Sequence, residues 1–281
     1  MLGLRHALAL GALQGPAELM PVSSSGHIAL VPELLGWPYA DVDPELRKSF
    51  EVALHAGTAA ALAWVLRDEV AGVVRGMTLR RAVHVAVEFA PAAAAGLAFE
   101  RPIERRLGTV RTVAAAQVAA GALLWWADRA PARRPGDEAT VRDHLVIGLA
   151  QATALIPGVS RNGATLTAAR LLRFRRRDAS RLSRRAALPI ILGATALKGA
   201  RLARRGLPPG TAGALSVGAA AAFASTLASA RIVEAVDNAR SYRPFAAYRI
   251  AIGLAALSRG SGHALQRNSS EAPGAAHDLT P

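Results

Sequence analysis

The chain has 281 residues, and 52% of them are hydrophobic even without counting its 25 glycines, whereas soluble domains reach only about 45–50% with glycine included. Its formal net charge is +14, but the basic residues lie between apolar runs, which is typical of the loops of membrane proteins and argues against a nucleic-acid partner. The chain contains no cysteine, which excludes disulfides, thiolate metal sites and a cysteine nucleophile.

The first predicted element is an apolar helix over residues 4–19, which Pro21 interrupts. A polar stretch over residues 22–26 follows, and His27 opens a second short apolar run that ends before Pro32. Broken backbone at membrane depth is stable only where protein buries it or where it lines a wet cavity. The opening run has no clean cleavage pattern, so we interpret it as the first helix of the mature protein and not as a signal peptide.

Several later stretches have the composition of membrane helices. They are residues 51–66, 82–99, 109–127, 186–199, 210–230 and 244–258. Only residues 211–230 offer the roughly 20 uncharged positions of a full span, so hydropathy alone leaves the number of spans open. The segment 259–281 is polar and rich in glycine, serine and proline, which predicts a disordered tail.

A second broken helix is predicted near the middle of the chain. Residues 144–156 are apolar, Pro157 and Gly158 interrupt them, and a polar stretch over 159–163 leads into another apolar run. At an offset of 137 positions this segment repeats the first one, with the matching pairs Gly11 and Gly148, Gln14 and Gln151, Ala17 and Ala154, Val22 and Val159, Ser23 and Ser160, and Gly26 and Gly163. Broken helices in corresponding positions of two halves indicate a site at the interface of the repeats.

The first broken helix carries side chains that suit a phosphate site. Gln14 and Glu18 lie four residues apart and share one helix face, and an ionised Glu18 is costly in an apolar setting. Ser23, Ser24 and Ser25 stand where the second helix starts, and free N–H groups and the positive end of the helix dipole favour phosphate there. The alternative interpretation is a serine-capped helix with a buried glutamate paired to an arginine.

The second broken helix supplies a cation. Ser160 is a natural N-cap, and Arg161 carries a forked array of donors that suits phosphate. Taken alone, this pair is equally well explained by a helix cap next to an arginine whose charged end reaches the membrane surface.

These two segments, LQGPAELMPVSSSGH and PGVSRNGAT, resemble the two signature regions of the undecaprenyl-diphosphate phosphatase family, also called the bacitracin-resistance protein family. The likeness extends from about residue 3 to residue 257. His55 stands where the family usually has glutamine, Glu88 where a small residue is common, and Asn162 where serine is usual. Arg184 and Arg185 occupy a stretch that is usually apolar. We expect these departures to affect helix packing and rate more than the type of reaction.

The resemblance implies an all-α polytopic membrane protein with one membrane domain over residues 1–258. This domain is expected to be an inverted repeat of halves at about 1–130 and 140–258, with two re-entrant helix hairpins that meet at one site. The implied activity removes the terminal phosphate of undecaprenyl diphosphate to give undecaprenyl phosphate, which recycles the lipid carrier for cell-wall synthesis and confers bacitracin resistance. A multi-pass location in the bacterial cytoplasmic membrane, a site open to its outer face and a homodimer are implied as well.

For this chemistry we expect Arg161 to neutralise phosphate charge and Ser24 to act as the nucleophile or the positioning hydroxyl. Glu18 is the expected base or, with Gln14, a ligand of a divalent cation such as Mg²⁺ or Ca²⁺. His27 is expected to donate to a phosphate oxygen, which completes the expected catalytic set of Glu18, Ser24, His27 and Arg161. The expected substrate-binding residues are Gln14, Ser23, Ser25, Gly26, Ser160, Asn162, Gly163 and Thr165. A phosphoserine route and direct attack by water both stay open.

Two other functional classes deserve comparison. The type-2 phosphatidic acid phosphatase superfamily also has serine–arginine and glycine–histidine elements, but it needs a histidine at a fixed spacing after the arginine. In this chain no histidine follows Arg161 until His263, which excludes that superfamily. A flippase or transporter of polyprenyl-phosphate lipids stays open, because inverted repeats with broken helices are also the architecture of transporters.

Overall fold

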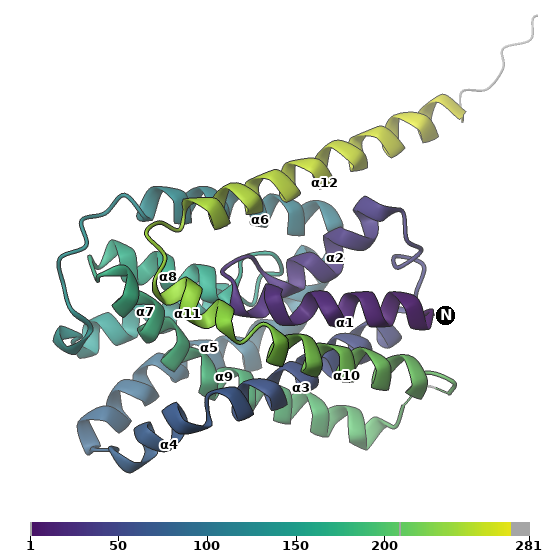
Figure 1. Ribbon diagram of the computed structural model, residues 1–281. Coiled ribbons are helices and arrows are strands. Elements are labelled where there is room, and N and C mark those ends of the chain that lie inside the picture. Colours follow the sequence, from purple (N-terminus) through teal and green to yellow (C-terminus); the bar gives the residue numbers. More distant parts are fainter. Residues whose placement is uncertain (1, 208, 271–281) are drawn as a thin grey trace, which may run out of the picture.

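The computed structural model describes residues 2–207 and 209–270, and within these ranges the protein is built from helices without a β-strand (Figure 1). The first half contains α1 (Leu4–Leu19), α2 (Ser24–Leu35), α3 (Pro44–Val65), α4 (Arg67–Arg75), α5 (Leu79–Leu107) and α6 (Val110–Ala127). After the short 3-10 helix η1 (Gly136–Glu138), the second half contains α7 (Val141–Thr153), α8 (Arg161–Leu171), α9 (Arg176–Arg205), α10 (Ala212–Ala228), α11 (Arg231–Asp237) and α12 (Arg243–Ser270).

Both predicted broken helices are present, and their breaks have the same local geometry. The N-cap of α2 is Ser23, with φ 74°, and its hydroxyl accepts a hydrogen bond from the Gly26 amide at 3.2 Å. The N-cap of α8 is Ser160, with φ 66°, and its hydroxyl accepts from the Gly163 amide at 3.1 Å. A positive φ costs a non-glycine residue about 1–3 kcal/mol, so the surrounding contacts must impose this conformation at both breaks.

The two halves exchange packing partners. Helix α1 packs on α10 of the second half, α7 packs on α5 of the first half, and α6 runs alongside α12 (Figure 1). Glycines permit the close crossings, because a Cβ on Gly11 would lie 2.5 Å from the Gly218 carbonyl oxygen and one on Gly148 would lie 2.6 Å from the Glu88 carbonyl oxygen. At the second crossing the Glu88 carboxylate lies 2.7 Å from Nδ1 of His144, so this unusual acidic residue has a partner.

Three helices in the described part of the chain are long and apolar enough to cross a membrane, namely α5, α6 and α9. Helices α10 and α11 add a fourth span if they are counted together, although they are bent by 53° at the break between them. Large apolar side chains on α5 are exposed, among them Leu97 and Phe99, as expected for a surface that contacts lipid. The prediction of an all-α polytopic membrane protein is confirmed.

The helix ends differ from the apolar stretches read from the sequence. Helix α3 begins seven residues before the predicted start at residue 51, because Asp43 caps it by accepting from the amides of Glu45 and Leu46. Likewise α12 continues to Ser270, so residues 259–270 of the tail predicted to be disordered are helical. Extending an existing helix costs far less than starting one, and no proline interrupts this stretch. The rest of that tail, residues 271–281, lies outside the described residues.

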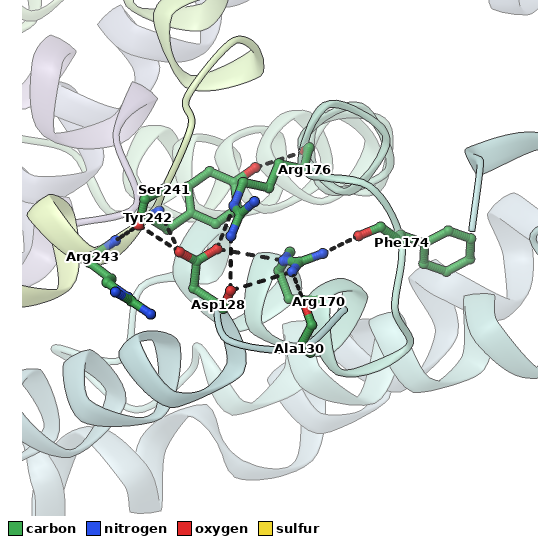
Figure 2. A network of polar contacts seen from close by, with 8 residues as sticks. All are labelled: Asp128, Ala130, Arg170, Phe174, Arg176, Ser241, Tyr242 and Arg243. Carbon is green, nitrogen blue, oxygen red and sulfur yellow. Dashed lines mark hydrogen bonds and ion pairs between the residues drawn. The ribbon is translucent and has the colours of Figure 1, made fainter. Parts of the chain in front are cut away.

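A buried carboxylate joins three segments at one end of the second half (Figure 2). Asp128, at the end of α6, is 1% exposed and accepts from Arg176 Nε at 2.7 Å, from Ser241 Oγ at 2.7 Å and from the Tyr242 amide at 3.0 Å. The fully buried Arg170 lies beside it, with Nε 3.6 Å from the carboxylate. Burial raises the pKa of the Asp128 carboxyl, but the bonds from Arg176, Ser241 and Tyr242 outweigh burial and hold the pKa below its usual value.

We predict that Asp128→Asn destabilises the protein by about 3 kcal/mol at neutral pH, because two arginines then lose a buried anionic partner. A carboxyl with a depressed folded-state pKa stabilises above its unfolded pKa, and that contribution disappears as pH falls through the folded value. The gap in melting temperature between the variant and the unmodified protein in detergent should therefore narrow below about pH 4. The exposed Asp137→Asn is the control, and a gap that does not depend on pH would contradict the assignment.

Candidate active site

Glu18 is the point where the two broken helices meet. It lies in the last turn of α1, and its Oε2 accepts a hydrogen bond of 2.6 Å from Ser24 Oγ at the start of α2. Its Oε1 accepts from Arg161 Nη2, at the start of α8, over 3.1 Å. The carboxylate therefore binds the hydroxyl and the cation at once, which confirms the prediction that the two segments come together.

A second pair of contacts fixes α8 against α1. The Asn162 side chain donates from Nδ2 to the Leu19 carbonyl oxygen at 3.1 Å and accepts at Oδ1 from Ser183 Oγ at 2.9 Å. An asparagine donates and accepts here from two separate atoms, whereas a serine would have to do both from one oxygen on a shorter side chain. Asn162 thus links the second broken helix to both α1 and α9.

A small cavity of about 50 Å³ opens beside these residues. Its polar end contains Glu18, Arg161 and Asn162, and its walls are mostly aliphatic. The aliphatic residues are Leu19, Leu62, Leu66, Ala187, Leu188, Ile191, Val233 and Val236. Arg184 also lines the cavity, but its guanidinium is held by Asp237 at 2.7 Å and Glu69 at 3.1 Å. Of the two arginines in the cavity lining, Arg161 is the one paired with Glu18 of the candidate site.

His27 has partners on both ring nitrogens. Nδ1 lies 2.7 Å from the Ser23 carbonyl oxygen, and Nε2 lies 2.7 Å from the Tyr248 hydroxyl. A carbonyl oxygen only accepts, so Nδ1 carries the proton and Nε2 accepts from Tyr248 in the neutral ring. The expected donation from His27 to a phosphate oxygen requires that the bond to Tyr248 first break, and in this geometry His27 orients the turn at Ser23.

The other expected binding residues fall into two groups. Ser25 Oγ lies 3.3 Å from Ser23 Oγ, close to the first break, whereas the fully buried Thr165 bonds Ser183 at 2.5 Å and faces protein rather than the cavity. The Thr165 hydroxyl therefore contacts protein in this structure, and its expected part in substrate binding stays a prediction. The hydroxyls of Ser23 and Ser160 are used as helix caps, as the alternative interpretation of the serines expected.

Gln14 bears on the question of a metal ion. Its amide is buried and neither its oxygen nor its nitrogen has a hydrogen-bond partner, which is unusual for a buried polar group. In the described residues no cluster of three or more histidine or acidic side chains could hold a metal ion by itself. A carboxylate and an amide oxygen are both ligands that hard divalent cations accept, so the donor chemistry of Glu18 and Gln14 fits Mg²⁺ or Ca²⁺.

Two functional candidates carry no assignment from the motifs. Arg249 in α12 and Gln117 in α6 are fully buried and hydrogen-bonded to each other, with Arg249 Nε 2.9 Å from Gln117 Oε1. Both also donate to carbonyl groups at the two breaks. Arg249 could have been noticed in the sequence, since it is the one arginine in the apolar stretch 244–258. Ionisable residues within membrane segments usually have a function. The contacts of Arg249 are distant in sequence, so no local pattern indicated them.

The chain is similar to known proteins over most of its length. Residues 7–255 match the family model described as bacitracin resistance protein BacA. The chain is 40% identical over 267 residues to the undecaprenyl-diphosphatase of Geobacter sulfurreducens, which covers 90% of this chain and 97% of that protein. It is 38% identical over 265 residues to the undecaprenyl-diphosphatase of Chromohalobacter salexigens, with 90% and 97% covered. A similar protein of the same name in Gemmatimonas aurantiaca is 36% identical over 262 residues.

The site geometry predicts a crosslink between the two halves. Leu19 and Asn162 both line the cavity and are joined by a hydrogen bond, so the variant Leu19→Cys with Asn162→Cys should be bridged by a short bifunctional reagent in native membranes. A protease site inserted in the loop near Ala132 then distinguishes linked halves, which migrate as one species on a denaturing gel, from separate ones. Each single-cysteine variant is the control. Failure of the folded double variant to crosslink would refute the shared site.

Proposed function

The chain belongs to the bacitracin resistance protein BacA family, and we propose that it is a membrane hydrolase that removes the terminal phosphate of undecaprenyl diphosphate to give undecaprenyl phosphate. The undecaprenyl-diphosphatase names of its relatives support this activity. The observation that carries the proposal is the convergence of Ser24 and Arg161 on Glu18, because a hydroxyl, a base and a guanidinium are the groups that phosphoryl transfer requires.

The cavity supports a lipid diphosphate as the substrate. Its polar end holds Arg161 and Asn162, while leucine, isoleucine and valine side chains form its walls. A diphosphate head group needs cationic and hydrogen-bonding partners, and the first isoprenoid units gain from contact with apolar surface. The lining of one cavity thus offers both kinds of contact, and the Ser24 hydroxyl is bonded to Glu18, which is part of that lining.

In the proposed reaction the terminal phosphate binds Arg161 and competes with Glu18 for the guanidinium. This frees Glu18 to accept the proton of Ser24, whose hydroxyl already donates to it over 2.6 Å. A bond forms between Ser24 Oγ and the terminal phosphorus, and the bond to the bridging oxygen breaks, so that undecaprenyl phosphate leaves. Glu18 passes its proton to the leaving undecaprenyl phosphate. Water then attacks the phosphoserine and gives one proton to Glu18, and the bond from phosphorus to Ser24 Oγ breaks. Glu18 returns that proton to Ser24 as inorganic phosphate leaves.

Several further features belong to the same proposal. A divalent cation, Mg²⁺ or Ca²⁺, bound through the substrate phosphates would add charge neutralisation beside Glu18 and Gln14. The two broken helices are re-entrant hairpins of an inverted repeat, which explains why each apolar run is too short to span a membrane. The enzyme acts in the bacterial cytoplasmic membrane as a homodimer with its site open to the outer face, recycles the lipid carrier for cell-wall synthesis and so confers bacitracin resistance.

Phosphate release from proteoliposomes that contain undecaprenyl or farnesyl diphosphate tests the function, and Arg161→Lys is the decisive variant. An ammonium cannot hold two phosphate oxygens as a guanidinium does, so turnover should fall on the order of a hundredfold. Arg161→Ala should lose little more. Near-normal turnover of the lysine variant would show that Arg161 contributes only diffuse charge, and lipid movement without phosphate release would identify a flippase.

We predict that Glu18→Gln preserves the fold but lowers turnover on the order of a hundredfold or more, because the amide cannot take the proton of Ser24. Gln14→Ala should be milder. The Gln14→Ala variant should mainly need a higher concentration of Mg²⁺ or Ca²⁺ for activity. In the unmodified protein, removal of divalent ions with a chelator should reduce activity. If Glu18→Gln kept most of its turnover at saturating metal, Glu18 would not be the base.

A further inference from the structure

Arg249 is a buried cation whose partners are uncharged. Its guanidinium is fully buried, and Nη2 donates to the carbonyl oxygens of Gly158 at 2.9 Å and Val159 at 2.7 Å. Nη1 lies 3.4 Å from the Pro21 carbonyl oxygen, and Nε donates to Gln117. One side chain on α12 therefore contacts both helix breaks, although these breaks are far apart in the sequence.

Gln117 completes the connection from α6. Its Oε1 accepts from Arg249, and its Nε2 donates to the Val22 carbonyl oxygen at 2.8 Å. The carbonyls that follow the ends of α1 and α7 cannot be bonded within a helix, and a buried carbonyl without a donor is costly. The Arg249–Gln117 pair supplies those donors at both breaks and joins them into one hydrogen-bonded unit.

The equivalent glycines of the two repeats leave room for this pair. A Cβ on Gly163 would lie 2.4 Å from Arg249 Nη1, and a Cβ on Gly26 would lie 2.7 Å from Gln117 Nε2. Each glycine sits three residues after the serine that caps its helix. Both motif glycines are thus explained by the close approach of the pair, in addition to any contact with substrate.

We propose that Arg249 and Gln117 are positioning residues that hold the two breaks in register and thereby set the distances between Ser24, Glu18 and Arg161. This inference rests on the proposed phosphatase function. Ser24 follows Val22 by two residues and Arg161 follows Val159 by two, so a displaced carbonyl displaces the reacting side chain. A misplacement of about 1 Å can cost roughly a hundredfold in rate.

A guanidinium suits this task better than other side chains. The carbonyl oxygens of Pro21, Gly158 and Val159 carry partial negative charge, and together they stabilise the buried cation. The planar fork directs separate N–H groups at Gln117, at the first break and at the second break, whereas an ammonium donates from one point. Neither Arg249 nor Gln117 lines the cavity, so their effect on catalysis is indirect and should appear in kcat rather than in KM.

The test compares Arg249→Lys with Arg170→Lys, measuring kcat, KM and melting temperature with farnesyl diphosphate in detergent. Arg170 is the matched control because it is also fully buried and donates to the carbonyls of Ala130 and Phe174, away from both breaks. We expect Arg249→Lys to lose at least about tenfold in kcat with KM changed by less than about threefold. Arg170→Lys should lose melting temperature but keep kcat. Equal kcat losses in both variants, or none in Arg249→Lys, would overturn the proposal.

A second readout is independent of activity. The crosslinking yield of Leu19→Cys with Asn162→Cys should fall when Arg249→Lys or Gln117→Ala is added, and should not change when Arg170→Lys is added. Gln117→Ala removes the link to the first break while keeping the cation, so it replaces Arg249→Lys if that variant does not fold. An unchanged yield in these backgrounds would overturn the positioning role. Absence of phosphate release by the unmodified protein would refute the proposed function alone, because the crosslinking comparison still decides the inference.

Discussion

A helix that breaks inside an apolar structure leaves carbonyl groups that water cannot reach, and the rest of this molecule depends on how they are satisfied. Arg249 donates to Pro21, Gly158 and Val159 across both breaks. With those carbonyls held, Ser23 and Ser160 adopt positive φ and direct the first turns of α2 and α8 toward each other. The geometry of the candidate site thus depends on hydrogen bonds that satisfy the carbonyl groups at the two helix breaks.

Four arginines, two buried and two half-buried, differ in the groups that stabilise their charge. Carbonyl dipoles stabilise the charge of Arg249, whereas Asp128 and nearby carbonyls stabilise that of Arg170. The charge of Arg184 is paired with the carboxylates of Asp237 and Glu69. None of these partners belongs to the candidate site. Arg161 differs because its carboxylate partner, Glu18, also holds the Ser24 hydroxyl. In the proposed reaction an incoming phosphate replaces Glu18 at Arg161, and the same exchange leaves Glu18 free to take the proton of Ser24.

Much of this arrangement was predictable, because proline and polar residues interrupting short apolar runs mark both breaks, and their matching spacing indicates that they meet. The ends of α3 and α12 were not, since capping by Asp43 and helix propagation past Arg259 do not appear in hydropathy. The partners of His27 and the role of Arg249 were also missed. Their contacts to Tyr248 and to Gly158 join distant positions, and only the packing of α12 brings them together.

The exchange of helices between the halves also affects biosynthesis. Pro21 leaves the ribosome early, but the arginine that donates to its carbonyl oxygen lies on α12, the last helix of the described chain. At about 5–20 residues per second, the first half waits on the order of ten seconds or more before that helix is made. Under the positioning role that we propose for Arg249, activity is expected only after α12 has been synthesised.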